Sequence, residues 1–277
     1  MDIDGPVPGI PGANIRRVNE LSEHLPGGEP AGPHVQAKPG QLLLTVPGVC
    51  RYLVRDGTSI EFAPAPDADP GAVRLFLNGS ARGALIHQRG ELPLHAATLV
   101  PPGGETALAI CGGSGAGKST LAAELSRRGW LLVADDTTRI TWNETHAMAW
   151  PSRDSIKLWR DACDTNDLDV AGLERVTAAL DKYYLHVPAL SQPVRLAAVC
   201  ELLVDGQEPQ GALSPGGKMS LLTRHTYRQA YIRPLGRQAD FVRLVSLVAN
   251  TCRIGQFLGG RSLPVRELAD AVEQSMK

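Results

Sequence analysis

Short apolar runs alternate with glycine- and proline-rich turns between residues 41 and 90. Asp56-Gly57 favours a hairpin turn, because both residue types tolerate the positive φ that such turns require. The spacing predicts a small β-rich module over residues 41–90. A Pro/Gly-rich segment, residues 1–40, precedes it and is typical of a loop or linker at 24–33. The expected strands are Leu42–Val46, Cys50–Val54, Ser59–Phe62 and Val73–Leu77.

From residue 91 onward, the pattern changes to strands that alternate with helix-spaced apolar positions. This alternation predicts an α/β domain over residues 91–277. Strands are expected at 94–100, 106–111, 130–134 and 194–204, with a hairpin formed by 137–142 and 148–150. Helices are expected at 119–128, near 158–163, near 172–180, at 241–252 and at 265–274.

Composition narrows the class of protein. The 277 residues carry a formal net charge of -1, so no global basic field points to nucleic acid. No apolar run approaches the ~18 residues that span a bilayer, and the first residues lack a signal-peptide pattern. The five cysteines are scattered, as expected for small apolar residues in a reducing compartment. We therefore expect a cytoplasmic protein without a membrane or nucleic-acid partner.

Residues 112–119 read Gly-Gly-Ser-Gly-Ala-Gly-Lys-Ser, which is the complete phosphate-binding loop pattern. The pattern lies between an expected strand and an expected helix, where its mechanism requires it. Backbone N–H groups wrap a phosphate chain, Lys118 reaches the outer phosphates, and the Ser119 hydroxyl ligates Mg²⁺. The predicted nucleotide-binding residues are Gly112, Gly113, Ser114, Gly115, Ala116, Gly117, Lys118, Ser119 and Thr120.

A tandem acid, Asp135-Asp136, follows Lys118 after one expected helix and one apolar strand. If that strand neighbours the strand before the loop, both end at the same edge of the sheet and the acids face the phosphates. One carboxylate is enough to hold Mg²⁺ through water. The second suits a base that accepts the proton of an attacking hydroxyl. A helix cap or a solvated turn is the alternative interpretation.

Two further side chains are candidates for the site. If residues 101–104 form a four-residue hairpin loop, Val100 pairs with Glu105 and His95 pairs with Ile110. His95 then approaches the mouth of the phosphate loop, although a histidine in the core is the alternative. Lys157 follows the second hairpin, where a cation can stabilise charge on a phosphoryl group. A solvated lysine whose stem covers Trp159 is equally compatible with the sequence.

Three segments in this order and spacing resemble the C-terminal domain of the HPr serine kinase/phosphorylase family. They are Leu94–Ala97, Gly112–Thr120 and Leu132–Asp136. The segment Ile156–Trp159 is similar to one in the compact HPr-kinase-like proteins, which include kinases of lasso-peptide clusters that act on a precursor serine. The resemblance covers roughly residues 85–190. It implies a mixed, antiparallel-rich sheet with a P-loop kinase core, akin to phosphoenolpyruvate carboxykinase.

The same resemblance implies roles for individual residues. Asp135 would be the base, Asp136 would support it or the metal, and Lys118 and Ser119 would hold ATP and Mg²⁺. His95 would orient Asp135 or the phosphate. Glu201 would be a third metal ligand beside Ser119 and Asp136, but the Arg-Gly-Leu-Gly signature of the bifunctional enzymes is absent after it. This departure argues against phosphorylase activity and against HPr as the substrate. Relatives in that family form hexamers, so a homo-oligomer is compatible with the resemblance.

Three functions follow from these patterns. The first is an ATP-dependent, Mg²⁺-requiring kinase that phosphorylates a serine hydroxyl of a peptide or small protein, for example a lasso-type precursor. The second is a kinase for a small-molecule hydroxyl, which would use the same residues. The third is a nucleotide-binding regulator without catalysis, against which the second acid argues, because binding alone requires no base.

Overall fold

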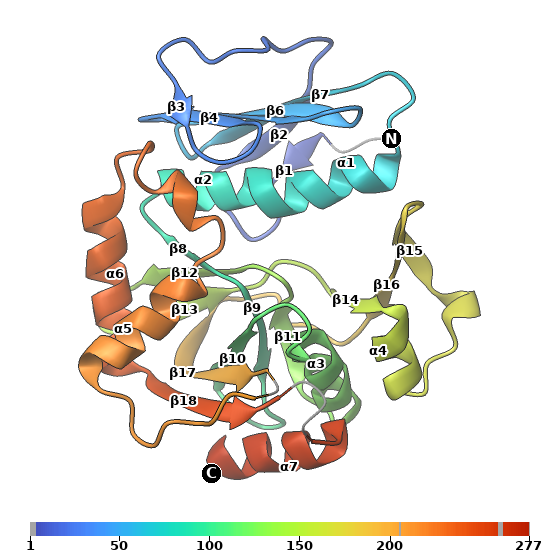
Figure 1. The fold of residues 1–277 in the computed structure, drawn as a ribbon, viewed down its shortest axis with the longest axis vertical. Coiled ribbons are helices and arrows are strands. Elements are labelled where there is room, and N and C mark those ends of the chain that lie inside the picture. The colour runs from blue at the N-terminus through green and yellow to red at the C-terminus, as the bar shows by residue number, and fades with distance from the viewer. Residues whose placement is uncertain (1–3, 205, 260–262, 277) are drawn as a thin grey trace. The chain divides into compact units, whose positions relative to one another are not determined.

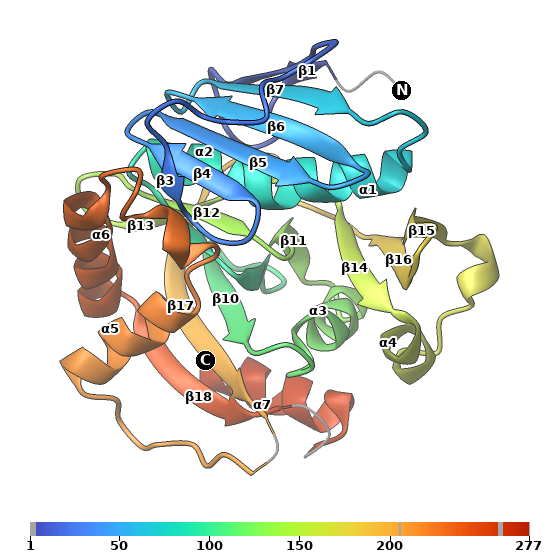
Figure 2. The ribbon, with the colours of Figure 1, turned by 45° about the horizontal axis from the view of Figure 1, so that its top comes forward.

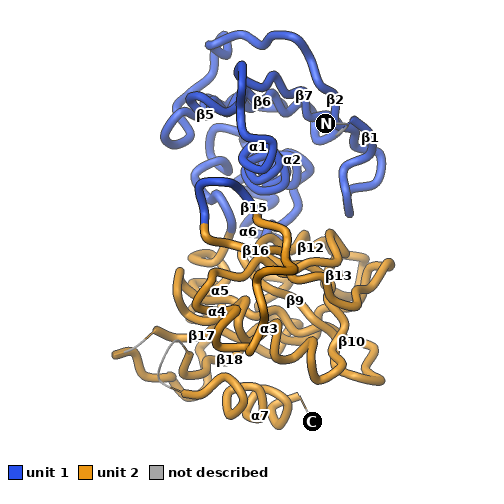
Figure 3. The backbone as a smooth tube through the Cα atoms, turned by 90° about the vertical axis from the view of Figure 1, so that its right-hand side faces the viewer, with its two compact units in different colours: residues 1–93, 176–180, 227–244 blue, residues 94–175, 181–226, 245–277 orange. Residues whose placement is uncertain are grey.

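The computed structural model describes residues 4–204, 206–259 and 263–276. The chain forms two compact units, coloured separately in Figure 3. Unit 1 takes in the described parts of Met1–Pro93 together with Val176–Leu180 and Tyr227–Leu244. Unit 2 takes in Leu94–Arg175, Asp181–Thr226 and the described parts of Val245–Lys277. Within the described ranges, no helix combines the length and the apolar character needed to cross a membrane.

Unit 1 contains a seven-stranded sheet in the order β1-β2-β7-β6-β5-β4-β3 (Figures 1 and 2). Strands β2 and β7 pair in parallel, and the other neighbours pair antiparallel. Asp56 and Gly57 have φ of 52° and 66° between β6 and β7, which confirms the predicted turn. The strands are β1 (Gly5–Pro6), β2 (Asn14–Arg17), β3 (Glu29–Pro30), β4 (Val35–Lys38), β5 (Gln41–Val46), β6 (Cys50–Arg55) and β7 (Ser59–Pro64).

The structure corrects two expectations for this unit. The segment at 24–33 is not wholly a loop, because Glu29 and Pro30 pair with β4. The expected strand Val73–Leu77 is wrong: α1 (Pro70–Phe76), η1 (Leu77–Ala81) and α2 (Arg82–Gln88) occupy this region. Asp69 caps α1 by accepting a hydrogen bond from the Gly71 N–H, and Pro70 occupies the first turn. These start signals favour a helix over the β-prone run that follows them.

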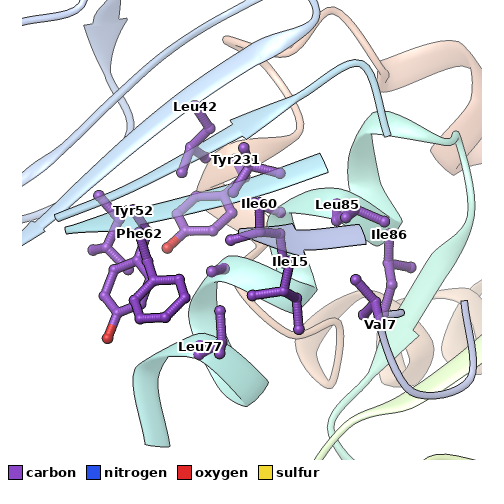
Figure 4. Packing of buried hydrophobic residues seen from close by; sticks show 14 of the residues in the cluster. Val7, Ile15, Leu42, Tyr52, Ile60, Phe62, Leu77, Leu85, Ile86 and Tyr231 are labelled. Carbon is purple, nitrogen blue, oxygen red and sulfur yellow. The ribbon is translucent and has the colours of Figure 1, made fainter. Parts of the chain in front are cut away.

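Helical spacing also provides the core of unit 1. Val73, Leu77, Ala81 and Leu85 are all buried, and they recur every four residues along one face of the α1-to-α2 segment. This face packs against the sheet, where Tyr52, Ile60 and Phe62 are buried (Figure 4). Burial of this apolar surface stabilises the unit, and it explains why tertiary packing overrides the local β propensity.

Unit 2 contains a mixed sheet with the strand order β11-β9-β10-β17-β13-β12, and β18 also pairs with β17. Strand β17 runs parallel to β10 and β18, whereas the hairpin partners run antiparallel. The expected mixed α/β class is thus confirmed. The strands of this unit are β9 (Ala96–Val100), β10 (Thr106–Gly112), β11 (Leu131–Ala134), β12 (Thr138–Trp142), β13 (Ala147–Trp150), β17 (Val194–Leu203) and β18 (Arg253–Leu258), and β8 (Leu92–Leu94) precedes them.

A second strand pair in unit 2 consists of β14 (Ser155–Trp159) and the unit 2 part of β16 (Leu180–His186), which run antiparallel. The helix expected near 172–180 is wrong. A single turn, η2 (Val170–Gly172), is followed by β15 (Glu174–Thr177) and β16. Val176 and Thr177 are β-branched residues that favour extended backbone, and this preference outweighs the spacing of the apolar positions.

Helices cover the mixed sheet of unit 2. Leu121 and Leu125 of α3 pack in one cluster with Leu99 and Ile110 of the sheet and with Leu268 of α7. The expected helices at 119–128, 241–252 and 265–274 are confirmed within a few residues, and the expected helix near 158 begins at Arg160 instead. The helices of unit 2 are α3 (Lys118–Arg127), α4 (Arg160–Thr165), α5 (Pro215–Arg224) and α7 (Val265–Met276), together with the later part of α6 (Gln238–Thr251). The earlier part of α6 and the short η3 (Gln229–Tyr231) belong to unit 1.

Candidate functional site

The glycine-rich segment connects β10 to α3, so the strand and helix predicted to flank it are confirmed. Gly112, Gly115 and Gly117 have φ of 154°, 79° and 89°, a region that side chains rarely permit. A Cβ at Gly112 would lie 2.8 Å from the Leu202 carbonyl oxygen and 2.9 Å from the Ala116 Cβ. The first glycine is therefore required both for backbone conformation and for close packing against β17.

Lys118 and Ser119 begin α3 and line a cavity beside the loop. The Lys118 ammonium donates hydrogen bonds to the carbonyl oxygens of Gly112 and Gly113, at 2.8 and 3.0 Å. Burial lowers the pKa of Lys118. The ammonium thus lies across the loop, where it can exchange carbonyl partners for an anion. The N–H groups of the first turn of a helix provide the same preference for anions.

The tandem acid reaches the same cavity by a route that differs from the prediction. Strand β11, which ends just before Asp135, pairs with β9 and not with β10. Because β9 is antiparallel to both β10 and β11, those two strands run in the same direction and end at one edge. The expected neighbouring strand is therefore wrong, but both Asp135 and Asp136 line the cavity together with loop residues.

A tight turn explains how two consecutive carboxylates face one cavity. Successive side chains of a strand point to opposite faces of the sheet. At Asp136 the backbone leaves the strand with φ of 69°, and the Thr137 N–H donates to the Asp135 carbonyl oxygen at 2.8 Å. These features define a γ-turn, a rare and strained conformation. Strain of this kind is concentrated at functional sites.

His95 lies beside this turn. The hairpin register differs from the prediction, because Ile110 pairs with Ala97 and Cys111 with Ala96. The turn between β9 and β10 is thus longer than expected, and the register shifts by two residues. His95 Nδ1 donates to the Asp136 carbonyl oxygen at 2.7 Å and lies 3.5 Å from its carboxylate. Burial and the nearby Lys118 lower the pKa of His95, which favours the neutral ring.

Lys157 is bound to the acid pair. Its ammonium forms an ion pair and a hydrogen bond with the Asp136 carboxylate. Its backbone N–H donates to Asp135 Oδ2 at 2.9 Å. Burial acts against the charged form of Lys157, but the two carboxylates outweigh it and raise its pKa. The side chain therefore neutralises Asp136, and the interpretation of Lys157 as a solvated lysine is wrong.

The two carboxylates have different proton affinities. Burial raises the pKa of Asp135, and the charge of Asp136 adds to the effect. Burial also acts to raise the pKa of Asp136, but Lys157 and His95 outweigh it and lower that pKa to about 2. Two acids with pKa values pushed apart are typical of a site in which one group exchanges protons and the other stays ionised.

The cavity has a volume of about 570 Å³ and lies in unit 2. Several of its walls were not predicted from the sequence. They come from Trp159 at the end of β14, from α4, from Lys182 of β16 and from residues 263–268 at the start of α7. These segments are distant in the sequence and carry no motif. The structure shows that Trp159 is exposed and lines the cavity with the acids, and no sequence pattern predicts this position.

Glu201, the third expected metal ligand, does not line the cavity. Its carboxylate accepts hydrogen bonds from Arg224 at 2.8 and 2.6 Å, from His225 at 2.6 Å and from Gln256 at 2.7 Å. Four donors match the four lone-pair sites of a carboxylate. Burial opposes ionisation of Glu201, yet these hydrogen bonds lower its pKa. The arrangement is that of a saturated structural carboxylate.

The donor atoms beside the loop fit a divalent cation that is shared with phosphate. Ser119, Asp135 and Asp136 all line the cavity and provide hydroxyl and carboxylate oxygens, which Mg²⁺ prefers. Across residues 4–204, 206–259 and 263–276, no three His, Cys, Asp or Glu side chains converge into a metal cluster. Mg²⁺ sites with one or two carboxylates and substrate phosphates have this incomplete protein shell.

The fold and the cavity together define a mixed α/β protein in which a glycine-rich loop and an acid pair line one cavity. No family model and no curated protein matches the sequence. Among solved structures, the HPr(Ser) kinase/phosphatase from Coxiella burnetii is similar to this chain at 21% sequence identity and a TM-score of 0.31. The match covers 44% of this chain and 73% of that chain. A similarity this weak is no more than a hint of an HPr-kinase-like fold.

Proposed function

We propose that unit 2 is a phosphotransferase, which moves the γ-phosphate of ATP to the hydroxyl group of an acceptor. One observation carries the proposal. The loop that begins α3 and the Asp135-Asp136 pair line the same cavity, although 17 residues separate Lys118 from Asp135 in the chain. A nucleotide site alone needs the loop and a cation. A second carboxylate with a raised pKa is what a transfer to a hydroxyl requires in addition.

The donor side of the site consists of the loop and the first turn of α3. Backbone N–H groups of residues 113–119 and the Lys118 ammonium would bind the phosphates of ATP. Ser119 and Asp136 would hold Mg²⁺, whose charge neutralises the phosphate oxygens when it is bound. The saturated Glu201 is not assigned to the metal in this proposal.

The acceptor side depends on Asp135. Its carboxylate takes the proton of the acceptor hydroxyl while the acceptor oxygen bonds to the γ-phosphorus. At the same time, the bond between that phosphorus and the bridging oxygen of ADP breaks, and the electron pair leaves with ADP. Lys157 keeps Asp136 ionised, and the backbone N–H of Lys157 holds Asp135 in place. His95 fixes the γ-turn through the Asp136 carbonyl oxygen.

The acceptor in this proposal is a serine of a peptide or small protein, such as a lasso-type precursor. The similarity of Ile156–Trp159 to a segment of the compact HPr-kinase-like proteins supports this class of acceptor. The exposed ring of Trp159 at the cavity also supports it, because aromatic rings offer a rigid contact for extended chains. A small-molecule acceptor would use the same catalytic groups.

The test is the Asp135→Asn variant, assayed for transfer from labelled ATP to serine peptides. We expect transfer to fall by about 10²–10⁴-fold, the usual contribution of a general base. ATP binding, measured by calorimetry, should change less than about twofold, because the Asn oxygen can still accept the Lys157 N–H. Asp181→Asn, an exposed acid on β16, is the matched control and should retain activity. Full transfer by Asp135→Asn would refute the assignment of the base.

A further inference from the structure

Two side chains at the cavity, Trp159 and Lys182, take no part in the chemical step of the proposed transfer. Trp159 is 48% exposed and ends β14, and Lys182 lies on the neighbouring strand β16. The Lys182 ammonium lies 5.1 Å from the centre of the Trp159 ring. Both side chains line the same cavity as Asp135. An ammonium over an aromatic face is attracted by the ring and is held in a defined place.

The strand register relates this pair to the acids. Trp159 pairs with Lys182, and Lys157 pairs with Tyr184, in the antiparallel β14–β16 ladder. Directly opposed residues share a face of the sheet, as do residues two apart on one strand. Lys157 and Lys182 therefore belong to one face. Lys157 extends to Asp136, and Lys182 lies farther along the same face with Trp159.

Lys182 differs from the other lysines of the site in its partners. Lys118 donates to loop carbonyl oxygens, and Lys157 is paired with Asp136. In the part of the chain that the structure describes, the Lys182 ammonium makes neither a direct hydrogen bond nor a direct ion pair; it lies over the ring and interacts with the Asp136 and Asp135 carboxylates only at longer range. Burial lowers the pKa of Lys182 and the charge of Lys157 lowers it further, while the charges of Asp136 and Asp135 act in the opposite direction without outweighing them. An ammonium that has no direct hydrogen-bond acceptor in a partly enclosed cavity is stabilised by an incoming anion that supplies one.

We propose that Lys182 and Trp159 form a subsite for a carboxylate of the acceptor, next to the hydroxyl that receives the phosphate. This inference rests on the proposed function and names a chemical property of its acceptor. The subsite belongs to the acceptor side because it is built on the strand pair that binds the acids, whereas the donor side is the β10–α3 loop. One ammonium beside a flat ring suits a planar carboxylate, while phosphate recognition typically uses several converging donors.

The carboxylate has two chemical sources, and matched acceptors distinguish them. One pair is a serine peptide with Asp or Asn directly after the serine. The other pair is L-serine and L-serinamide. Each of these four acceptors is assayed with wild type, Lys182→Gln, Lys182→Arg and the control Arg175→Gln. Arg175 also lies over an aromatic ring, Tyr183, but it does not line the cavity. The readout is the ratio of kcat/KM for the carboxylate and amide members, with the Kd of Mg·ATP measured separately.

We expect wild type to favour the carboxylate member of one pair by at least about tenfold, which corresponds to ~1.4 kcal/mol. Lys182→Gln should reduce that ratio to between about one and two, with the Kd of Mg·ATP changed less than twofold. Lys182→Arg should keep most of the preference, and Arg175→Gln should keep all of it. A merely structural role of Lys182 would lower all rates together and leave the ratio unchanged.

Two results would overturn the subsite while leaving the proposed function intact. One is transfer by wild type without a carboxylate preference. The other is a Lys182→Gln variant that keeps the preference, or that instead binds Mg·ATP at least tenfold more weakly. If wild type transfers phosphate to none of the four acceptors, the proposed function fails for these acceptors, and a binding assay with the same pairs then tests the subsite. A change in tryptophan fluorescence that only the carboxylate member causes, and that Lys182→Gln abolishes, would support the subsite. The absence of such a change would refute the subsite.

Discussion

Gly112 occupies a point in the loop where any side chain would collide with its neighbours. Its φ of 154° is a glycine conformation, and a Cβ at this position would lie closest to atoms of Leu202 and Ala116. Gly112→Ala should therefore displace the loop. We expect a loss of about 1–3 kcal/mol in the free energy of unfolding and at least about tenfold weaker ATP binding, by urea denaturation and calorimetry.

Gly103→Ala is a control that introduces backbone strain without the steric collision expected for Gly112→Ala. Gly103 has φ of 67°, but a Cβ there would meet no atom within 4 Å. It should cost about 1–2 kcal/mol, the usual penalty of a left-handed residue, and leave ATP binding unchanged. Equal effects of the two substitutions on ATP binding would contradict the role assigned to the packing of Gly112.

The acid pair should leave opposite signatures in the pH dependence of stability. Because burial raises the pKa of Asp135, the folded state binds its proton more tightly than the unfolded state does. Its contribution to stability is present below pH 3.8 and is lost as the pH rises through the raised pKa. Asp135→Asn, which cannot ionise, should thus be more stable than wild type at pH 7 and equal to it below about pH 4.

Asp136→Asn should behave in the opposite way. The pKa of Asp136 is lowered to about 2, so its contribution is present above pH 3.8 and is lost as the pH falls towards 2. This variant should be less stable than wild type at pH 7 and converge with it at low pH. Urea denaturation of the three proteins between pH 3 and pH 8 measures both trends. A destabilised Asp135→Asn at pH 7 would show that the lysines dominate its environment.

At the scale of elements, Arg128 connects α3 to α7. Its guanidinium donates to Glu124 on α3 at 2.8 Å, and to Asp270 and Glu273 on α7 at 2.6 and 3.1 Å. It also donates to the carbonyl oxygen of Arg266 at 2.9 Å. Residues 263–268 form one wall of the cavity, so the position of α7 affects the site.

Arg128→Ala should therefore weaken ATP binding although Arg128 does not line the cavity. We expect a loss of about 1.5–3 kcal/mol in stability, as for hydrogen bonds to charged groups, and a several-fold higher Kd for Mg·ATP. Arg127→Ala is the matched control, because Arg127 binds the same Glu124 but, among the described residues, forms no hydrogen bond or ion pair with α7. Thermal unfolding and calorimetry compare the two. If both arginines affect the Kd equally, α7 is not positioned by Arg128.

Elements with strong local signals were predictable from the sequence. The strand–loop–helix unit at 106–127 follows from glycine spacing, and the Asp56-Gly57 turn follows from residue type. The strand expected at Val73–Leu77 failed because a β-prone composition hid a four-residue burial period. The order β11-β9-β10 was also inaccessible, because sequence patterns identify strands but do not say which strands pair. The position of Trp159 and Lys182 beside the acids also depends on strand pairing, so local sequence patterns do not predict it.

At the scale of the whole molecule, the compact units are discontinuous in the sequence. Two later segments, Val176–Leu180 and Tyr227–Leu244, belong to unit 1. Local sequence patterns do not predict that a later segment packs with an earlier unit, because each segment by itself resembles an ordinary connection between elements. All residues that line the cavity belong to unit 2. A ligand bound in the cavity should therefore stabilise segments of unit 2 and leave unit 1 unchanged, and experiments can detect this difference.

Hydrogen exchange should reveal that division when Mg·ATP is added. We expect slower exchange at residues 112–120, around Asp135 and at the start of α7, because a bound ligand stabilises the segments that hold it. At 100 times the Kd, binding adds about 2.7 kcal/mol to stability. Strands β5 to β7 of unit 1 should show no change. Lys118→Ala, with its weakened anion site, should abolish the effect, and protection confined to unit 1 would refute the location of the site.

Strand β9 has a consequence for the geometry of the reaction space. Hydrogen-bonded strands lie about 4.8 Å apart, so β9 holds the lines of β10 and β11 roughly 9.6 Å from each other. The register also staggers the two ends, because Ala134 ends β11 at the level of Ala109, whereas β10 continues to Gly112. In the proposed transfer, the inserted strand would act as a spacer between the strand of the loop and the strand of the acids. A strand that contributes no side chain to the lining of the cavity thereby sets the length of the path along which the phosphoryl group would travel.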